Sequence, residues 1–207
     1  MGKTIHGLDM FHIALLKEDS LERLEYEVPE RLPGAVNVSV DPKSEQNPFY
    51  ADNGTYDIIN SLGDIDVDME LADLPLEIQE KIYGLEEENG VQFSSKNDQA
   101  AYLALAFRAK VSNSDSYRYY WLLKGMPSLL PTEHKTDEGS ADPQTTKVTL
   151  KFMPVDYGKK RWKAQAQDGV KNFMGGAEWF KQVVHEGSSF SAGSGTTQTA
   201  DLGGTTE

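Results

Sequence analysis

The sequence predicts a mainly β protein with one short helix and one protruding hairpin. Apolar and polar residues alternate with a period of two through most segments of the 207-residue chain, which is the pattern of half-buried strands. In addition, Asn53-Gly54 separates two β-prone runs. An Asn-Gly pair in that position is the strongest short-range hairpin signal, because both residues tolerate positive φ.

The first strands are expected close to the N-terminus. Residues 9–16 are apolar and rich in β-formers. Pro33-Gly34 predicts a turn, and the valines that follow it at positions 36, 38 and 40 alternate with polar residues. We therefore expect a half-buried strand over residues 36–41.

A protruding hairpin is predicted at about residues 42–60. Its first part, 42–48, is polar and looks like a connection, and two short β-prone runs at 49–51 and 55–59 flank the turn. Connections of this length are uncommon in compact domains unless they have a role.

The next strand, residues 64–71, carries all its carboxylates on one face. Acidic residues occupy the even positions and apolar residues the odd ones. A register slip of one residue would bury the carboxylates, so the sequence strongly specifies which side chains of the strand point into the core. The four acidic residues are Asp64, Asp66, Asp68 and Glu70.

A short helix is expected after this strand. Asp73 can cap it, Pro75 suits the first turn, and Gly84 is a favourable C-terminal stop. Glu77 complements the positive end of the helix dipole. Apolar residues at 74, 78 and 82 share one face.

Longer alternating strands follow in the second half of the chain. We expect them at 101–111, 117–124 and 148–153, with a further strand over 161–167 and either a short helix or a strand over 177–184. Tyr119 and Trp121 continue an apolar alternation, which favours core packing for both.

Composition limits the function classes. Twenty Lys and Arg against 33 Asp and Glu give a net charge of −13, which argues against binding to nucleic acid or to an anionic membrane. The chain has no cysteine, which excludes disulfides, thiolate metal sites and a cysteine nucleophile. The N-terminal segment lacks the apolar core of a signal peptide, and no apolar run approaches the ~20 residues that cross a bilayer. We expect a protein that is made and folded in the cytosol.

Three regions are expected along the chain. Residues 1–8 form an N-terminal arm, and residues 9–185 form the β domain. Residues 186–207 are rich in Gly, Ser and Thr and have too few apolar side chains to offset the entropy cost of ordering, so a flexible tail is expected.

Catalytic and metal-binding motifs are weak. The four histidines, at positions 6, 12, 134 and 185, have no metal-ligand spacing. The Asp64-x-Asp66-x-Asp68 pattern resembles the start of an EF-hand loop, but Met69 and Pro75 stand where that loop needs Gly and Glu. No catalytic residue, metal site or cofactor is predicted.

Several motifs together resemble the major tail proteins of long-tailed phages, specifically the phi13-like family of tail tube proteins. The ordered set spans about residues 5–155, and the segment at 177–180 resembles the family's closing segment less closely. The motifs are Leu-Pro-Gly-Ala-Val at 32–36, Phe-Tyr-Ala-Asp-Asn-Gly at 49–54, Leu-Gly at 62–63, Ala-Asp-Leu-Pro at 72–75, Ala-Tyr-Leu-Ala-Leu-Ala-Phe-Arg at 101–108 and Tyr-Tyr-Trp-Leu-Leu-Lys-Gly at 119–125.

This resemblance implies a β-sandwich or barrel of tail-tube type with one flanking helix. Six copies would form a ring, and stacked rings would form a channel for DNA delivery. The implied partners are other copies of the chain, the tape-measure protein, and the tail terminator and tail-tip or baseplate proteins. DNA would pass through without specific binding, and the protein would reside in the virion tail after assembly in the host bacterial cytoplasm.

Two sets of residues are candidates for roles in such a tube. The acidic strand face, Asp64, Asp66, Asp68 and Glu70, is a candidate lining of the bore, because carboxylates repel phosphates. Cationic side chains at positions 108, 110, 118 and 124 are alternative partners for these acids. The candidate contacts between rings are Phe49, Tyr50, Asp52, Asn53, Gly54 and Tyr56.

Two other functions remain open from the residues alone. A carbohydrate-binding β-sandwich could use a platform of exposed aromatic side chains, for which Tyr117, Tyr119, Tyr120, Trp121 and Trp162 are available. A hydrolase could use paired carboxylates, although alternate carboxylates of a strand lie side by side on an open face.

Overall fold

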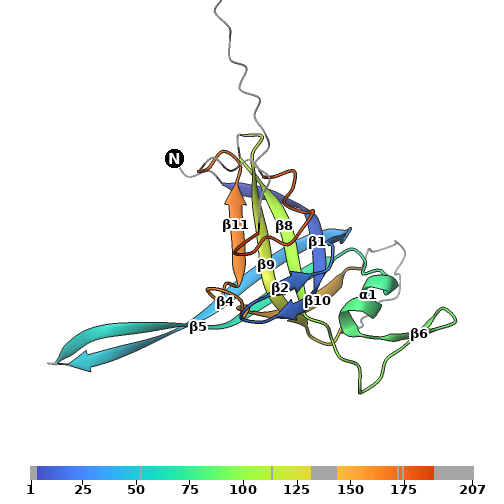
Figure 1. Cartoon of the computed structure of the whole chain (residues 1–207), viewed down its shortest axis with the longest axis horizontal. Coiled ribbons are helices and arrows are strands. Elements are labelled where there is room, and N and C mark those ends of the chain that lie inside the picture. The colour runs from blue at the N-terminus through green and yellow to red at the C-terminus, as the bar shows by residue number, and fades with distance from the viewer. Residues whose placement is uncertain are drawn as a thin grey trace, which may run out of the picture.

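The protein folds around one large antiparallel sheet, shown in Figure 1. This computed structural model describes residues 4–51, 53–112, 114–131, 144–171, 173 and 175–188. Along the sheet the strand order is β2-β1-β8-β9-β10-β5-β4, while β11 pairs with β9 and β3 pairs with β1. The elements of the large sheet are β1 (Ile5–Asp19), β2 (Leu24–Tyr26), β3 (Glu30–Arg31), β4 (Ala35–Ala51), β5 (Gly54–Leu71), β8 (Leu103–Val111), β9 (Tyr117–Pro127), β10 (Thr146–Met153) and β11 (Lys163–Gln167). The mainly β prediction is therefore confirmed.

Strands β8 and β9 are buried on both faces. Leu105 and Leu122 of this pair are fully buried on one side, and Ala106 and Trp121 are fully buried on the other. Strands β5 and β10 alternate instead between buried and exposed side chains over residues 64–71 and 146–153. The sheet is thus covered on both faces at its centre and on one face toward β4.

The first core lies inside the curl of the sheet. Strand β4 returns close to β1, and the side chains between them come from β1, β5, β8, β9 and β10. Helix α1 (Leu76–Tyr83) adds Ile78 and Ile82 to this core. The curled sheet with one flanking helix is the barrel-like arrangement expected from the sequence.

The second core lies on the opposite face of β8 and β9. The chain after β11 returns over this face, and Trp179, Val183 and Val184 from it are buried there. The indole nitrogen of Trp121 donates a hydrogen bond of 2.9 Å to the carbonyl oxygen of Trp179, which satisfies a fully buried donor. Tyr119 and Trp121 lie in this core, as predicted from their alternation.

Residues 177–184 form hydrogen-bonded turns rather than the helix or strand expected for them. Amides of Glu178 and Lys181 donate to carbonyl oxygens three residues earlier, at 3.1 Å in both cases. Burial of Trp179 fixes this segment by tertiary packing, so its local periodicity is a poor guide to its conformation.

The ends of helix α1 are only partly as predicted. Gly84 ends the helix with φ 66°, and a Cβ there would lie 2.5 Å from the carbonyl oxygen of Gln99, so glycine is required. Glu77 stands in the first turn, as expected. The Asp73 cap was wrong: Pro75 occupies the N-cap position and no side chain caps the helix.

Strand β4 is longer than its sequence indicates. Residues 42–48 were expected to be a connection, but they continue β4 and pair with β5, as in Pro42 opposite Ile65 and Pro48 opposite Ile58. Proline is tolerated in this ladder because β4 is an edge strand whose other side has no neighbour in the sheet.

The structure describes the two ends of the chain only in part, so the expected division into three regions stays a prediction. Strand β1 already begins at Ile5, opposite Val111 of β8, so the expected N-terminal arm of residues 1–8 is shorter by the paired residues. Residues 189–207 of the expected tail lie outside the described part of the chain.

A second, small sheet was not predicted. It is a hairpin of two three-residue strands, β6 (Glu86–Glu88) and β7 (Val91–Phe93), joined at the Asn89-Gly90 turn. Asn89 and Gly90 both adopt positive φ at this turn, but strands of three residues are too short for an alternating pattern to indicate them.

Substitution of Gly125 by alanine should destabilise the fold. A Cβ at this position would lie 2.5 Å from two atoms of the Phe152 ring, which is buried in the first core. We expect a loss of about 1–3 kcal/mol in unfolding free energy, because overpacking forces neighbouring side chains off their rotamers. Urea denaturation measures this loss.

Gly54→Ala is the matched control, since its Cβ would meet nothing within 4 Å. Its unfolding free energy should stay within about 0.5 kcal/mol of the wild type. Equal stability of the two variants would contradict the packing of Gly125 against Phe152.

Candidate functional site

The acidic residues of β5 lie on one exposed face of the sheet. Ile65, Val67, Met69 and Leu71 are buried in the first core, and the residues between them point away from it. The predicted facing of residues 64–71 is therefore confirmed. The outer face of β4, β5 and β10 is called the acidic face below; its charged side chains are Asp41, Lys43, Asp64, Asp66, Asp68, Glu70, Lys147 and Lys151.

Lysines from both neighbouring strands reach the carboxylates of β5. The Nζ atom of Lys151 in β10 lies 3.1 Å from Asp64 and 3.7 Å from Asp66. On the other side, Nζ of Lys43 in β4 lies 3.8 Å from Asp66 and also binds Asp41. The hydrogen bond to Asp64, with the charges of Asp64 and Asp66, raises the pKa of Lys151.

Hydroxyl groups contact the other two carboxylates. Oγ1 of Thr149 donates a hydrogen bond of 2.8 Å to Asp68, and Oγ1 of Thr145 donates one of 2.6 Å to Glu70. Thr149 suits its position in β10 because its branched side chain favours a strand while its hydroxyl reaches Asp68, the residue opposite it. These contacts hold the acidic side chains in an ordered row.

The acidic face keeps a net negative charge. Five carboxylates against three lysines leave a net charge of −2. The ion pairs on it are solvent-exposed, and such pairs contribute about 0–1 kcal/mol each, so they do little for stability. What the arrangement provides is an ordered pattern of charges on the exposed face of the sheet.

The four cationic residues considered as partners for these acids pair elsewhere. Arg108 binds Asp9 at 2.7 Å, Arg118 binds the amide oxygen of Gln167, and Lys110 lies 3.9 Å from Asp115. Lys124 binds the buried carboxylate of Asp19 at 2.6 Å. Within the described part of the subunit, none of the four reaches residues 64–70.

The β4–β5 hairpin projects far from the body of the molecule, as Figure 1 shows. Asn53 adopts φ 62° at its turn, as expected, whereas Gly54, the other residue of the expected Asn-Gly turn, begins β5 opposite Ala51. Phe49 and Tyr56 are 57% and 74% exposed, and their rings meet edge to face at 6.3 Å. Ile58 and Leu62 add further exposed apolar surface. Of the other candidate contacts, Asp52 lies outside the described residues and the side chain of Tyr50 is not described.

An isolated two-stranded ribbon with exposed aromatic side chains is marginally stable in water. Exposed apolar patches of this kind mark surfaces that bind a partner. The projecting hairpin is therefore a candidate contact surface.

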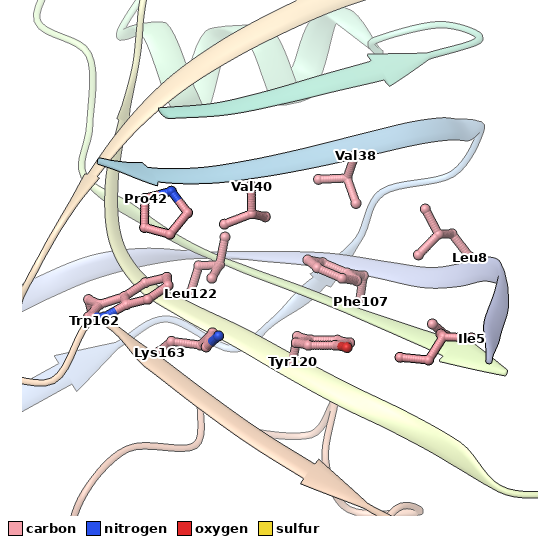
Figure 2. A pocket seen from close by; sticks show the side chains of 11 residues that line it. Ile5, Leu8, Val38, Val40, Pro42, Phe107, Tyr120, Leu122, Trp162 and Lys163 are labelled. Carbon is pink, nitrogen blue, oxygen red and sulfur yellow. The ribbon is translucent and has the colours of Figure 1, made fainter. Parts of the chain in front are cut away.

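The sequence analysis missed an apolar groove between the edge strands β4 and β11. It encloses about 380 Å³, with Val38, Val40 and Pro42 on one side and Trp162 and Lys163 on the other, as Figure 2 shows. The alternation of valines in β4 indicated one wall. The opposite wall lies more than 100 residues away in the chain, so no local signal could pair the two.

The aromatic residues considered for a carbohydrate platform do not gather on one exposed surface. Tyr119 and Trp121 are 4% and 0% exposed in the second core. Tyr120 stacks on Phe107 at 4.8 Å and lines the groove with Trp162. The guanidinium of Arg108 covers the ring of Tyr117 at 4.0 Å. This arrangement gives no support to a sugar-stacking platform.

Among the described residues, no group of three or more His, Asp or Glu side chains is placed to hold a metal ion. In that same part of the chain, no helix is long and apolar enough to span a bilayer.

Comparison with known proteins identifies the family. A family model described as phage tail tube protein matches residues 42–189, which is more than half of the chain. The chain belongs to the phage tail tube protein family. The resemblance seen in the sequence is confirmed at the family level, and this tail tube protein is a structural component of a phage tail.

One match among solved structures is the sheath–tube complex of an extracellular contractile injection system (PVC) in its extended state. It matches with a TM-score of 0.45 and 13% sequence identity, over 76% of this chain and 88% of that chain. No curated protein sequence matches the tail tube protein significantly.

Replacing the aromatic side chains of the hairpin should reduce assembly of the subunit without changing the stability of its fold. In Phe49→Ser combined with Tyr56→Ser, both sites are exposed and remote from the two cores, so the unfolding midpoint should not change. The fraction of protein in sedimentable assemblies should fall at least tenfold, because the proposed contact loses its apolar surface.

The control is Val28→Ser combined with Leu129→Ser, which removes two exposed apolar side chains outside the hairpin. It should assemble as the wild type does. If the hairpin variant also assembles normally, the hairpin is not a contact surface.

Proposed function

We propose that the subunit assembles into rings, six copies to a ring, and that stacked rings form a channel that conducts DNA. The observation that carries this proposal is the tail tube family match over residues 42–189. The fold supports it by presenting three unpartnered features: the open sheet edges, the projecting hairpin and the acidic face.

A ring requires a head-to-tail contact between two different surfaces of the subunit. Strand β4 ends the large sheet, and β11 pairs on only one side, with β9. Open edges of this kind extend from one subunit to the next through main-chain hydrogen bonds. The two edges are therefore suited to contacts within a ring.

Stacking of rings requires an element that reaches beyond the body of the subunit. The β4–β5 hairpin has this shape, and Phe49 and Tyr56 give it an apolar surface near its tip. We assign the contacts between rings to this hairpin, with Asn53 and Gly54 at its turn and Tyr50 and Asp52 beside it.

The acidic face is the proposed lining of the bore. It is the uncovered face of the sheet around β5, and it keeps a net negative charge after its lysines are counted. Carboxylates repel DNA phosphates over a Debye length of about 8–10 Å. The lysines within the row reduce the strength of that repulsion without reversing it, so DNA would pass without adhering.

The remaining partners follow from the same proposal. The tube would enclose the tape-measure protein during assembly in the host cytoplasm and contact the tail terminator and the tail-tip or baseplate proteins at its ends. The role is structural, and none of the acidic residues is assigned catalysis.

Electron microscopy of the concentrated protein tests the central proposal. We expect rings or tubes, either from the protein alone or after addition of tail-tip proteins that initiate assembly. A protein that stays monomeric in both conditions would overturn the proposed function.

Neutralising the acidic face tests the lining separately. The variant Asp64→Asn, Asp66→Asn, Asp68→Asn and Glu70→Gln changes the net charge of the face from −2 to +2. We expect tubes to form, because these side chains are outside both cores, while phage carrying the variant eject DNA more slowly. Ejection rates from purified phage measure the effect.

The matched control neutralises four acids on other surfaces: Glu22→Gln, Glu77→Gln, Glu80→Gln and Asp115→Asn. This variant should eject DNA at the wild-type rate. Failure of the acidic-face variant to form tubes would instead place these residues in a subunit interface.

A further inference from the structure

None of the residues that the structure describes occupies the open groove between β4 and β11. Its floor is made by Phe107 and Leu122, which are 6% and 0% exposed, and its walls are half-exposed apolar side chains. Figure 2 shows the side chains of both walls pointing toward each other across the groove. The outer backbone of β4 runs along it with no neighbouring strand in the sheet.

One cation lines this groove, and further cations lie close to it in the chain. Lys163 is the one charged residue among those that line it, and the segment 159–163 contains four cations in a chain of net charge −13. Lys159 and Arg161 lie 3.6 Å from Glu186 of the same subunit. Lys160 and Lys163 form no ion pair with any residue in the described ranges, so they are available to a partner.

The small β6–β7 hairpin carries the complementary surface. Glu86 lies opposite Phe93 in its ladder and Glu88 lies opposite Val91, so these four side chains share one face. All four residues are exposed, and Val91 and Phe93 are each 52% exposed. Neither glutamate side chain contacts a cation within the described part of the chain.

The other face of this hairpin is held by its own subunit. The side chain of Gln92 donates a hydrogen bond of 2.7 Å to the carbonyl oxygen of Leu76, at the start of α1. The acidic and apolar face therefore points away from its own subunit. In Figure 1 the hairpin and β11 lie on opposite sides of the molecule, so one subunit cannot fill its own groove.

We propose that the β6–β7 hairpin of one copy docks in the β4–β11 groove of the next copy. Val91 and Phe93 enter the apolar groove, while Glu86 and Glu88 pair with Lys163, which lines it, and with Lys160, three residues earlier in the chain. The contact joins two different surfaces on opposite sides of the subunit, so it repeats head to tail and can close a ring. This inference rests on the proposed tube and names its contact within a ring.

The β4–β5 hairpin of another copy is a less suitable occupant. Its projecting part, residues 44–62, also carries acidic residues only, but the proposed tube already uses it for contacts between rings. The β6–β7 face presents carboxylates beside its apolar side chains, which matches an apolar groove whose one charged lining residue is the cation Lys163.

Reversing each side of the contact separately, and then mixing the two variants, tests the proposal. Glu86→Lys with Glu88→Lys makes the hairpin basic, and Lys160→Glu with Lys163→Glu makes the groove side of the contact acidic. Each variant alone should lower the sedimentable fraction at least tenfold through like-charge contacts. A mixture should recover most of it, because alternating copies restore opposite charges at every contact.

A control variant, Glu22→Lys with Glu77→Lys, changes the net charge equally at exposed sites elsewhere and should assemble as the wild type does. Normal assembly of either reversed variant would overturn the proposal. Loss of assembly in both variants without recovery in the mixture would also overturn it.

Cross-linking gives a second measurement, and the absence of cysteine makes the chain a clean background for it. A variant with Glu88→Cys and Lys163→Cys, treated with a short bismaleimide, should give a ladder of covalent oligomers on a denaturing gel. Each single-cysteine variant should give dimers at most, and Glu88→Cys with Glu22→Cys should give no ladder.

The outcomes separate this contact from the tube itself. Tubes seen by electron microscopy without a ladder would overturn the docking proposal and leave the tube proposal standing. A ladder from Lys163→Cys combined with Tyr56→Cys instead would assign the groove to the β4–β5 hairpin. A wild type that never assembles would overturn both.

Discussion

Burial of β8 and β9 on both faces is the constraint on which the rest of the structure depends. Trp121 and Leu122 are adjacent in β9, point to opposite faces and are both 0% exposed, so each face of the strand pair needs its own cover. One cover is the curled remainder of the sheet with α1, and the other is the chain that returns through Trp179. The strands farthest from this pair have only one apolar face, and this leaves the acidic face open.

The open face and the open edges are thus two results of one arrangement. A fully closed barrel would have hidden the outer backbone of β4 and filled the groove beside it. Because the sheet curls without closing, the described part of the subunit retains a row of carboxylates on one surface and, on another, an apolar groove beside the unpaired edges of β4 and β11. A subunit that must contact several neighbours needs separate surfaces of this kind.

The sequence was informative where local pattern and burial agree. Asp64 to Leu71 has strict alternation, and a slip by one residue would bury charge, so its facing could be predicted without tertiary information. Gly84 and the Asn53 turn were predictable because their backbone conformations exclude most residues.

Prediction failed where distant contacts determine the structure. Pro42 and Pro48 indicate a connection, and only the folded sheet shows that β4 is an edge strand that tolerates them. Burial of Trp179 holds its segment in turns, which the periodicity of that segment does not indicate. The cap expected from Asp73 was wrong because Pro75, which has no side chain able to cap, occupies the N-cap position. The groove depends on bringing Val40 beside Trp162, which only the folded chain does.

The projecting hairpin also has a mechanical consequence. Its outer part, from Ser44 to Ala51 in β4, is held to the body through a single ladder, and at ~3.3 Å per residue it extends for roughly 25 Å. A two-stranded ribbon twists and bends more easily than the wide sheet behind it. In a stack of rings linked by such ribbons, curvature of the whole tube would be absorbed in the ribbons as elastic deformation. The tube could flex in solution while the two cores of every subunit stayed undistorted.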